Sequence, residues 1–347
     1  MTALSPLVIA NASAAAQEGV KVAEPHFIRI TDDAGAGGYE AFPDVTRLRN
    51  GDLLSVFYAG YGHVSLPNES LPKGGRVCWI RSSDNGKTWT RPKVAVDTDI
   101  DDRDPSVTQT SDGTLICTFF TYDGAQPQAH CEIYIARSHD NGETWGKPHR
   151  VPPPEGIGWA TSAPILQLPG GELILPVYFW QQGKKSKSGL VRSNNGGRTW
   201  GGFAVIDPES DHEHDSEPHI IRLPDGRLFT TLRPCMCQSY SSDNGHTWTT
   251  STRTGFEGHA PYHLVTRDGL LLCAHRLPNT ALHISTDFGA TWKGPFVIDD
   301  VIGSYPSMVE LPDGTVFCVY YEEGEGSSIR GTWFRARPDG IDFVRPK

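Results

Sequence analysis

The strongest constraint on the fold is a motif that occurs five times, Ser-x-Asp/Asn-x-Gly-x-Thr-Trp, called the box below. Its first copy runs from Ser82 to Trp89, and the other copies end at Trp145, Trp200, Trp248 and Trp292. Each box follows a short alternating apolar run, which predicts a strand entering a tight turn. The Asp or Asn side chain can accept bonds from following backbone N–H groups, and Gly accepts a positive φ. A repeat of this size suits one four-stranded blade of a β-propeller.

Two further patterns fix the number of blades at six. A Gly-x-Leu-Leu type turn recurs with its glycine at positions 51, 113, 171, 226, 269 and 314. An x-Pro pair precedes each glycine, namely Phe42-Pro43, Asp104-Pro105, Ala163-Pro164, Glu217-Pro218, Ala260-Pro261 and Tyr305-Pro306. Proline is tolerated at the first position of a strand, so each pair is expected to open the first strand of a blade. The box then forms the hairpin between the third and fourth strands.

The sixth repeat has no box, which leaves its blade one strand short. After residues 316–321 only residues 328–336 remain as a further strand, whereas residues 25–30 alternate near the N-terminus. Pairing the two chain ends would close the ring and remove exposed edges. We therefore predict an all-β fold: a six-bladed β-propeller with four-stranded antiparallel blades, closed by an N-terminal strand.

This frame divides the chain into a single propeller domain, residues 23–347, and an N-terminal segment, residues 1–22. The segment is either a flexible tail or the remnant of a signal peptide, because Leu7-Val8-Ile9 precedes an Ala-rich stretch without a basic start. The compartment stays open, with a secreted or periplasmic location favoured over a cytoplasmic one.

Charge and composition exclude several partners. The formal net charge is −10, whereas a protein that binds nucleic acid needs a basic face. No apolar run is long enough to cross a bilayer, so no membrane partner is expected. The 7 cysteines sit mostly in apolar strand patterns, which favours buried thiols over a disulfide framework. No metal and no organic cofactor is implied.

Repeat symmetry places the six x-Pro residues in one ring at an end of the central axis. The residues seven positions after each glycine form a second ring at the same end: Tyr58, Phe120, Tyr178, Arg233, Arg276 and Tyr321. A purely structural ring would be apolar, but these rings include Asp104, Glu217 and Tyr305 beside the two arginines. Such a mouth is typical of a pocket that recognises an anion or cleaves a glycoside.

Boxes on a six-bladed array, with Glu-Pro, Arg, Arg and Tyr in this order, resemble the sialidase (neuraminidase) superfamily over nearly the whole chain. The resemblance implies that Tyr305 is a nucleophile whose proton passes to Glu217, since a phenol alone is a poor nucleophile at neutral pH. It also implies that Arg233 and Arg276 grip a substrate carboxylate with planar guanidinium groups. The structural alternative is an ion-pair network within the channel.

Further substrate contacts follow from the same resemblance. Asp104 matches the Asp-Pro pocket position of the family. Glu322 resembles the glutamate that orients the first arginine of the family's triad. Tyr58 and Tyr178 are expected to line the pocket, although core packing explains either of them equally well.

Two departures from the family pattern concern the first triad arginine and the acid/base aspartate. Phe42 occupies the arginine position, and residues 59–76, where the aspartate is expected, contain none. Arg29 and Arg103 are the candidates to replace the missing guanidinium. His63 or Glu69 is the expected proton donor, and His63 needs the smaller pKa shift.

The expected function is a sialidase-like exo-glycosidase that hydrolyses a terminal, acidic sugar, nonulosonic or uronic, from a glycan or glycoconjugate. Two alternatives remain. One is a polysaccharide lyase in which Arg neutralises a uronic carboxylate and Tyr or His abstracts the α-proton. The other is a non-catalytic glycan-binding propeller, which the missing arginine and aspartate would suit.

Overall fold

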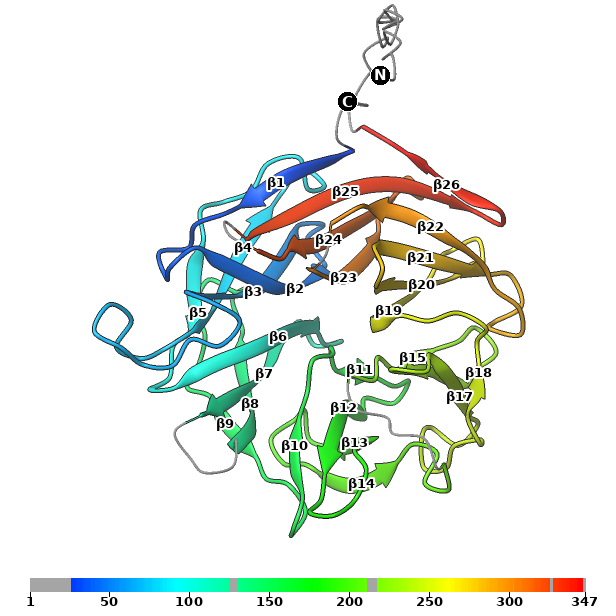
Figure 1. Cartoon of the computed structure of the whole chain (residues 1–347), viewed down its shortest axis with the longest axis horizontal. Helices are drawn as coiled ribbons and strands as arrows, with labels where there is room; N and C mark the ends of the chain where they lie inside the picture. The colour runs from blue at the N-terminus through cyan, green and yellow to red at the C-terminus, as the bar shows by residue number, and fades with distance from the viewer. Residues whose placement is uncertain (1–25, 125–129, 211–216, 302, 325–326, 346–347) are drawn as a thin grey trace, which may run out of the picture.

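The computed structural model describes residues 26–124, 130–210, 217–301, 303–324 and 327–345. The expected N-terminal segment, residues 1–22, therefore lies outside the described residues. Six antiparallel sheets are arranged around a central axis, like the blades of a propeller (Figure 1). In this part of the chain no α-helix occurs, and nothing is long and apolar enough to form a helix across a membrane. The predicted fold class is confirmed.

The first three blades follow the chain in order, each starting at the axis. The first blade contains β2 (Tyr39–Arg47), β3 (Leu53–Gly60), β4 (Arg76–Ser82) and β5 (Lys93–Val96). The second contains β6 (Asp101–Gln109), β7 (Leu115–Asp123), β8 (His130–Ser138) and β9 (His149–Val151). In the third, β12 (Leu173–Trp180), β13 (Lys187–Ser193) and β14 (Gly201–Val205) follow an inner strand split into β10 (Gly158–Ala160) and β11 (Leu166–Gln167).

The remaining blades complete the circle. The fourth contains β15 (Ile221–Arg222), β16 (Leu228–Leu232), β17 (Cys237–Ser241) and β18 (Thr252–Arg253). The fifth contains β19 (His259–Val265), β20 (Leu271–Arg276), β21 (Thr280–Ser285) and β22 (Lys293–Asp299). The sixth contains β23 (Gly303–Glu310), β24 (Val316–Glu322), β25 (Ser328–Arg337), β1 (Phe27–Thr31) and β26 (Gly340–Phe343).

The ring closes where the two ends of the chain meet, as predicted. Strand β1 pairs antiparallel with β25, with Phe27 opposite Thr332 and Arg29 opposite Arg330. The later part of β25 pairs instead with β26, which the sequence prediction missed. The turn Pro338-Asp339-Gly340 reverses the chain into this short hairpin, so the sixth blade has a divided outer edge rather than a single fourth strand.

The x-Pro pairs differ from the expectation in one respect: in four blades they lie inside the first strand, at a β-bulge. The strand register shifts between Ala41 and Asp44, and at the equivalent places in β6, β19 and β23. Five of the six residues before proline have a positive φ: Phe42 (52°), Asp104 (46°), Glu217 (58°), Ala260 (49°) and Tyr305 (39°). A bulge re-aims a side chain and leaves proline without a ladder bond to lose.

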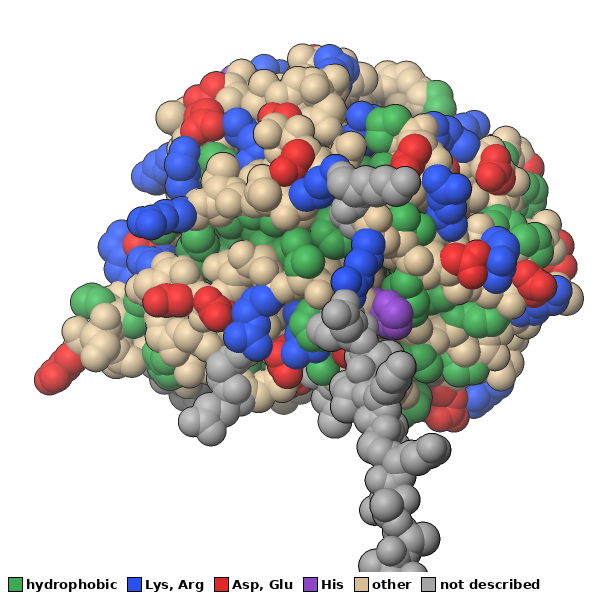
Figure 2. Space-filling view, turned by 90° about the horizontal axis from the view of Figure 1, so that it is seen from above, with side chains coloured by type: hydrophobic (Ala, Val, Ile, Leu, Met, Phe, Trp, Pro, Cys, Tyr) green, Lys and Arg blue, Asp and Glu red, His purple; other side chains and the backbone are tan. Residues whose placement is uncertain are grey.

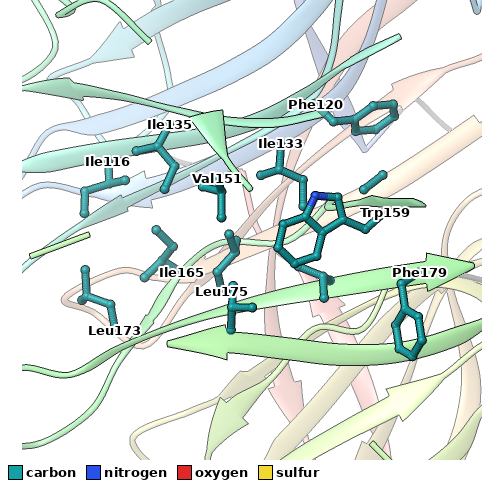
Figure 3. Packing of buried hydrophobic residues seen from close by; sticks show 13 residues of the cluster. Ile116, Phe120, Ile133, Ile135, Val151, Trp159, Ile165, Leu173, Leu175 and Phe179 are labelled. Carbon is teal, nitrogen blue, oxygen red and sulfur yellow. The ribbon is translucent and has the colours of Figure 1, made fainter. Parts of the chain in front are cut away.

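Neighbouring blades pack face to face through apolar side chains. Between the second and third blades, Ile116, Ile133 and Ile135 meet Trp159 and Leu175, all of them almost fully buried (Figure 3). Similar clusters fill the other blade interfaces, including one that joins the fifth and sixth blades. Each blade is covered by a neighbour on both faces. The side chains that point to either face are therefore apolar, and the strand sequences are nearly continuous apolar runs.

Each box forms the hairpin between the third and fourth strands of its blade, as predicted. In the first box the Ser82 hydroxyl donates to Asp84 (2.7 Å) and accepts from the backbone N–H of Gly86 (2.8 Å). The other carboxylate oxygen of Asp84 accepts the Thr88 hydroxyl at 2.6 Å. The same local bonds recur in the other boxes that contain aspartate.

The boxes also join each blade to the one before it. A side chain on the third strand of the preceding blade donates to a backbone carbonyl within the box. The five donor and acceptor pairs are Trp333 and Asn85, Arg81 and Asn141, Arg137 and Gly197, Arg192 and Asn244, and Gln238 and Gly289. The box is therefore a clamp between blades as well as a turn within one.

Replacing Arg192 should weaken one of these clamps. Arg192 is 6% exposed, donates to the carbonyl of Asn244 at 2.8 Å and pairs with Glu172 at 3.2 Å. Because hydrogen bonds made by charged groups contribute about 1.5–3 kcal/mol, Arg192→Leu should lower the free energy of unfolding in urea by about that amount. The control is Arg198→Leu, at an exposed position in the third box, which should change it by less than about 0.5 kcal/mol. Equal effects of the two changes would contradict the clamp.

Four buried histidines lie between the fourth and fifth blades. His219 and His263 stack in parallel with ring centroids 5.5 Å apart, and the backbone N–H of His263 donates to His219 at 2.8 Å. His275 and His283 are hydrogen bonded through their rings at 2.9 Å. Burial lowers the pKa of His263 to about 3, and burial lowers the pKa values of His275 and His283 to about 4. These rings are therefore neutral at neutral pH.

The fold should lose stability in acid through these histidines. His263 takes up a proton near pH 6.5 when unfolded but only near pH 3 when folded, so its contribution is complete above about pH 6.5 and is lost as the pH falls. One such group gives a slope of about 1.4 kcal/mol per pH unit in that window. His263→Gln should reduce the slope of unfolding free energy against pH by about that much, and the exposed control His246→Gln should not. An unchanged slope in His263→Gln would contradict the assignment.

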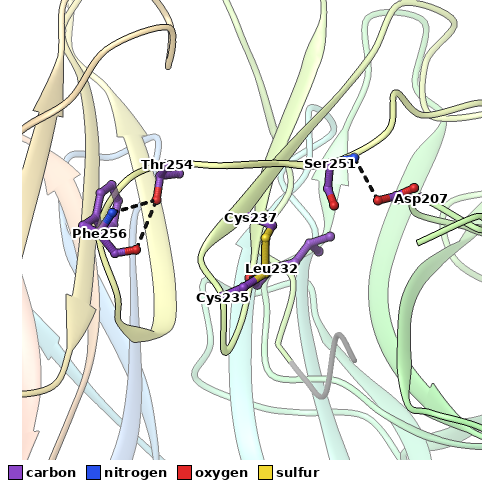
Figure 4. The surroundings of a disulfide bond; sticks show 7 residues. All are labelled: Asp207, Leu232, Cys235, Cys237, Ser251, Thr254 and Phe256. Carbon is purple, nitrogen blue, oxygen red and sulfur yellow. Dashed lines mark hydrogen bonds between the residues drawn. A yellow bond between two sulfur atoms is a disulfide. The ribbon is translucent and has the colours of Figure 1, made fainter. Parts of the chain in front are cut away.

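One cysteine prediction was wrong. Cys235 and Cys237 form a disulfide in the loop between β16 and β17, whereas the sequence favoured buried thiols over a disulfide framework (Figure 4). The remaining five are free, and Cys78, Cys117, Cys273 and Cys318 are buried.

On the face shown in Figure 2, Lys and Arg side chains are interspersed with Asp and Glu.

Candidate active site

A pocket on the propeller axis, called the mouth below, is lined by at least one residue of the x-Pro pair of each of the six blades. The lining includes Phe42, Asp104, Glu217, Ala260 and Tyr305. All five have a positive φ, and four of them, all but Glu217, lie at a bulge of the inner strand of their blade. In the third blade the inner strand is split and Ala163 lacks this conformation, and Ser162 and Pro164 line the pocket there. The ring predicted from repeat symmetry is therefore present.

Tyr305 and Glu217 meet at the bottom of this mouth. The Tyr305 hydroxyl donates to Glu217 Oε1 at 2.5 Å, across 88 residues of sequence. Arg233 Nη1 lies 2.9 Å from the other carboxylate oxygen of Glu217. The phenol, the carboxylate and the guanidinium thus form one continuous contact chain from the sixth blade to the fourth.

The environment of this pair shifts both pKa values upward. Burial raises the pKa of Tyr305 well above its usual value, and the carboxylates of Glu217 and Asp104 add to the effect. Burial also raises the pKa of Glu217, whereas Arg233 and the Tyr305 hydrogen bond act in the opposite direction. The Tyr305 hydroxyl therefore donates its hydrogen bond to a carboxylate whose own pKa is raised by burial.

Arg276 lies on the other side of Tyr305. Its guanidinium carbon is 5.2 Å from the centre of the Tyr305 ring, and its Nη1 is 4.0 Å from the carboxylate of Glu323. Arg276 Nε is buried and has no hydrogen-bond partner among the described residues. The Arg276 side chain as a whole is 20% exposed, while its Nε atom is buried.

His63 lies over the same mouth, on the loop between β3 and β4. Its Nδ1 is 3.2 Å from the Tyr39 hydroxyl and 3.9 Å from Glu323. Partial burial lowers the pKa of His63, helped by Arg103 and Arg276, whereas Glu323 and Glu217 raise it. The His63 side chain is 56% exposed, which leaves the ring accessible to a ligand.

Phe42 lines the mouth at the position where the family pattern has an arginine. Its ring lies edge-on to Tyr305 (5.0 Å) and to His63 (5.3 Å), measured between ring centres. Arg103 lies over the Phe42 ring at 5.5 Å. This wall of the mouth is therefore aromatic, with a guanidinium behind it.

Arg103 holds the His63 loop in place. It is 7% exposed, lies 3.7 Å from Asp101 and 3.9 Å from Asp104, and donates to the backbone carbonyl of His63. Asp101 accepts from the Tyr58 hydroxyl at 2.8 Å and from the backbone N–H of Ser65 at 3.2 Å. The loop is thus anchored from the second blade.

Asp104 and Tyr178 occupy the side of the mouth formed by the second and third blades. Ser162 donates to Asp104 Oδ2 at 2.7 Å, and Tyr178 lies beside the same serine. Asp104 Oδ1 is buried without a hydrogen-bond partner in the described part of the chain, apart from Arg103 at 3.9 Å. Burial raises the pKa of Asp104 and, with Asp104 and Glu217 nearby, that of Tyr178.

Four expected residues do not line the pocket. Tyr58 is fully buried behind Phe42, with ring centres 5.7 Å apart, and its hydroxyl donates to Asp101. Glu322 pairs with Arg330, whose other nitrogen contacts Asp299 at 2.9 Å. Glu69 is exposed, and Arg29 is an exposed residue of β1 that pairs with Asp32 at 3.4 Å. The structure does not bring these four side chains to the Tyr305 and Glu217 pair.

Sequence reasoning missed Tyr39 and Glu323, which both contact His63. Glu323 directly follows Glu322, and β24 ends between them, so side-chain alternation alone did not tell which carboxylate enters the mouth. Tyr39 starts β2 three residues before Phe42. Its position on the inner strand that also bears Phe42 was the sequence feature that could have identified it. Among the described residues, no group of three or more His, Cys, Asp or Glu side chains is arranged to hold a metal ion.

Removing the Tyr58 hydroxyl should loosen the His63 loop. Tyr58→Phe leaves Asp101 with one buried oxygen less well satisfied, so amide exchange of residues 61–75 should speed up and unfolding free energy should fall by about 1–3 kcal/mol. The matched control is Tyr61→Phe, which removes an exposed bond to the carbonyl of Leu66 at 2.9 Å. Hydrogen exchange followed by mass spectrometry distinguishes them. Unchanged exchange in the Tyr58 variant would show that Asp101 does not anchor the loop.

The fold and the mouth define the class: a six-bladed box-containing propeller with Tyr, Glu and Arg side chains clustered at one end of the axis. Residues 74–318 match the family of BNR repeat-like domains. The chain therefore belongs to this family, within the sialidase superfamily of propellers.

Individual relatives agree with this placement. The chain is 26% identical over 355 aligned residues to a sialidase from Micromonospora viridifaciens, covering 85% of this chain and 52% of that protein. The structure is similar to a protein of unknown function from Dyadobacter fermentans, with TM-score 0.76 and 22% identity, covering 90% of this chain and 98% of the other. It is also similar to the leech intramolecular trans-sialidase, with TM-score 0.70 and 15% identity, covering 91% and 71%.

These matches show the fold and the family. The chain spans between 52% and 63% of the length of the sialidases from Paraclostridium sordellii, Micromonospora viridifaciens, Bacteroides fragilis and Clostridium perfringens. The similar solved structures share less than a quarter of their residues with this chain, so their activities are not transferred by similarity alone.

Proposed function

We propose that this propeller is an exo-acting glycoside hydrolase that removes a terminal acidic sugar, nonulosonic or uronic, from a glycan. The observation that supports this most directly is the 2.5 Å hydrogen bond between the Tyr305 hydroxyl and Glu217, beside Arg233 and Arg276. A buried phenol paired with a carboxylate is an activated nucleophile, because the carboxylate removes the proton as the oxygen attacks.

The reaction proceeds in two displacements. In the first, Tyr305 Oη forms a bond to the anomeric carbon, the Tyr305 proton moves to Glu217, and the glycosidic bond breaks. The departing alcohol takes a proton from a donor in the mouth. In the second, water attacks the anomeric carbon and gives a proton to that same group, the bond between the anomeric carbon and Tyr305 Oη breaks, and the Tyr305 oxygen recovers its proton from Glu217. A tyrosine nucleophile is a recognised exception to the use of two carboxylates.

His63 is the proton donor in this proposal. The rings of His63 and Tyr305 both contact the Phe42 ring. Nδ1 of His63 lies beside Tyr39 and Glu323, and in the proposed reaction its Nε2 donates the proton to the leaving oxygen. Glu69, the other candidate, is exposed, and no contact joins it to the mouth among the described residues. A group that acts as general acid must be protonated, so the pKa of His63 sets the upper end of the active pH range.

The acidic substrate rests on the two arginines. Arg276 offers a buried Nε with no partner in the described structure, and Arg233 neutralises the base Glu217 while lining the same side. Phe42 in place of a third guanidinium makes the opposite wall apolar. This favours a sugar with one carboxylate and an uncharged face over a more highly charged ligand. Asp104 Oδ1 and Tyr178 then face its hydroxyl or amide groups.

Tyr305→Phe and Glu217→Gln should each lower kcat/KM by at least about 10³-fold, because each removes half of the nucleophile pair. The measurement is release of 4-methylumbelliferone from a panel of sialic, other nonulosonic and uronic glycosides. Tyr61→Phe, with its exposed hydroxyl, is the control and should keep full activity.

Other outcomes of that panel separate the alternative functions. An unsaturated product that absorbs in the ultraviolet would identify a lyase. Glycan binding without cleavage of any member would identify a binding propeller. Release of a neutral sugar alone would contradict the acidic substrate.

The proton donor can be identified from pH profiles on a substrate with an unactivated alcohol leaving group. Because the pKa of His63 is lowered from 6.5, kcat/KM of the unaltered enzyme should fall as the pH rises through a value below 6.5. His63→Gln should lower this rate by about 10²–10⁴-fold and abolish that limb, while activated aryl glycosides lose far less. Glu69→Gln is the matched control. A loss in Glu69→Gln with His63→Gln unaffected would reverse the assignment.

A further inference from the structure

A second cavity opens beside the active site, in the crevice between the fourth and fifth blades. Its volume is about 860 Å³, within the range that holds a drug-sized ligand or a short oligosaccharide. Phe256, the prolines at 234, 278 and 295, and Leu277 supply apolar surface, and His259, His275 and His283 add polar groups. The hydrolytic mechanism uses none of these side chains.

Three short segments of backbone are shared between this cavity and the catalytic mouth. Arg233 is followed by Pro234 and Cys235, Arg276 is followed by Leu277 and Pro278, and Ala260 is preceded by His259. His259 and Arg276 are also directly opposite each other in the pairing of β19 with β20. Pro234, Cys235, Leu277, Pro278 and His259 line the second cavity, whereas Ala260 lines the mouth and Arg233 and Arg276 lie beside Glu217 and Tyr305. The second cavity therefore begins at the residues next to the two arginines.

The walls of the cavity are held in position by contacts that do not involve a ligand. Phe256 stacks on His283 with ring centres 3.7 Å apart, and His283 bonds to the buried His275 at 2.9 Å. The loop that bears Phe256 runs past the Cys235 and Cys237 disulfide, and the backbone N–H of Thr254 donates to the carbonyl of Met236 at 3.3 Å (Figure 4). The cavity is therefore preformed, which lowers the entropy cost of binding.

The chemistry of the lining favours an uncharged, hydroxyl-rich ligand. The charged side chains at the cavity are Arg253 and Glu257, which are exposed and opposite in sign, so their charges balance. Neutral imidazoles can both donate and accept hydrogen bonds, as hydroxyl groups require. Both ring nitrogens of His275 already contact His283 and the carbonyl of Arg276, so His259 and the outer edge of His283 are the imidazole groups nearest to a ligand. The aromatic and proline surfaces match the apolar faces of sugar rings. An acidic group would find no excess positive charge here.

We infer that the crevice between the fourth and fifth blades is a subsite for neutral sugar residues of the same glycan whose terminal sugar enters the catalytic mouth. This inference rests on the proposed function for the identity of its occupant. It makes the protein selective for terminal sugars that are attached to an oligosaccharide, rather than for a free or singly linked sugar.

The test compares two substrates that share one terminal sugar: its aryl glycoside, and a tetrasaccharide in which it caps three neutral sugars. Arg253→Ala, Phe256→Ala and Glu257→Ala should each raise KM for the tetrasaccharide about tenfold, because each removes a side chain that binds the neutral sugars. All three should leave kcat/KM for the aryl glycoside unchanged.

The control Arg198→Ala lies in the exposed third box and should affect neither substrate. Arg253→Ala and Glu257→Ala are exposed changes, so they cover the case in which Phe256→Ala fails to fold. Equal kinetics of the unaltered protein and all three pocket variants on the tetrasaccharide would overturn the subsite.

A binding measurement separates this inference from the proposed function. Saturation-transfer NMR is recorded with neutral tetrasaccharides built on glucose, on mannose and on N-acetyllactosamine. At least one should bind the unaltered protein and lose its signal with Phe256→Ala and with Glu257→Ala. Binding of none, while the aryl glycoside is still cleaved, overturns the subsite alone. Binding in the crevice without cleavage of any glycoside overturns the hydrolase and leaves the glycan site.

Discussion

Five residues with a left-handed backbone determine where the functional side chains of this propeller point. Phe42, Asp104, Glu217, Ala260 and Tyr305 occupy equivalent places in five blades, each with a φ between 39° and 58°. Such a conformation costs about 1–3 kcal/mol for a residue other than glycine and persists only when the surroundings impose it. Each of the five is followed by a proline, and all but Glu217 lie at a bulge of the inner strand. As a result Tyr305 donates a hydrogen bond of 2.5 Å to Glu217, which lies 88 positions away in the sequence.

The five strained residues near the axis are held in place by contacts between blades farther from the axis. Apolar clusters fill the interfaces between blades, and each box accepts a hydrogen bond from the blade before it, from Trp333 in the sixth blade to Gln238 in the fourth. The interface between the fifth and sixth blades has no box and is joined instead by a large apolar cluster. Closure by β1 then ties the first described strand to the last blade. The mouth is thus built on a ring in which each blade is joined to its neighbours.

The site combines paired charges with an aromatic wall. Each arginine near the mouth has a carboxylate beside it: Arg233 has Glu217, Arg276 has Glu323, and Arg103 has Asp101 and Asp104. In the proposed function, a substrate carboxylate therefore binds guanidinium groups that already have an anionic neighbour. Phe42 stands where the family pattern has an arginine, and Arg103 contacts both the Phe42 ring and the backbone carbonyl of His63, the proposed proton donor.

Much of this arrangement could be predicted from the sequence, because the repeats identify positions that are equivalent in the six blades. The boxes, the six glycine turns and the x-Pro pairs specified six blades, closure by the N-terminal strand, and the shared mouth of Asp104, Glu217 and Tyr305. What could not be predicted depends on a shift of one residue or on local turns. Whether Glu322 or Glu323 enters the mouth depends on where β24 ends. The hairpin of β26, the split inner strand of the third blade and the Cys235 to Cys237 disulfide depend on turns without a repeat to compare.

In the proposed mechanism Tyr305 becomes covalently bonded to the substrate sugar. The most direct test is mass spectrometry of the protein after incubation with a glycosyl fluoride of the acidic sugar found in the substrate panel, with a second fluorine next to the anomeric carbon to slow release. We expect a mass increase of one sugar, located on the peptide that contains Tyr305 and absent from Tyr305→Phe. A sugar bonded to a different residue, or turnover of the ordinary substrate without any adduct and with inversion at the anomeric carbon, would contradict it.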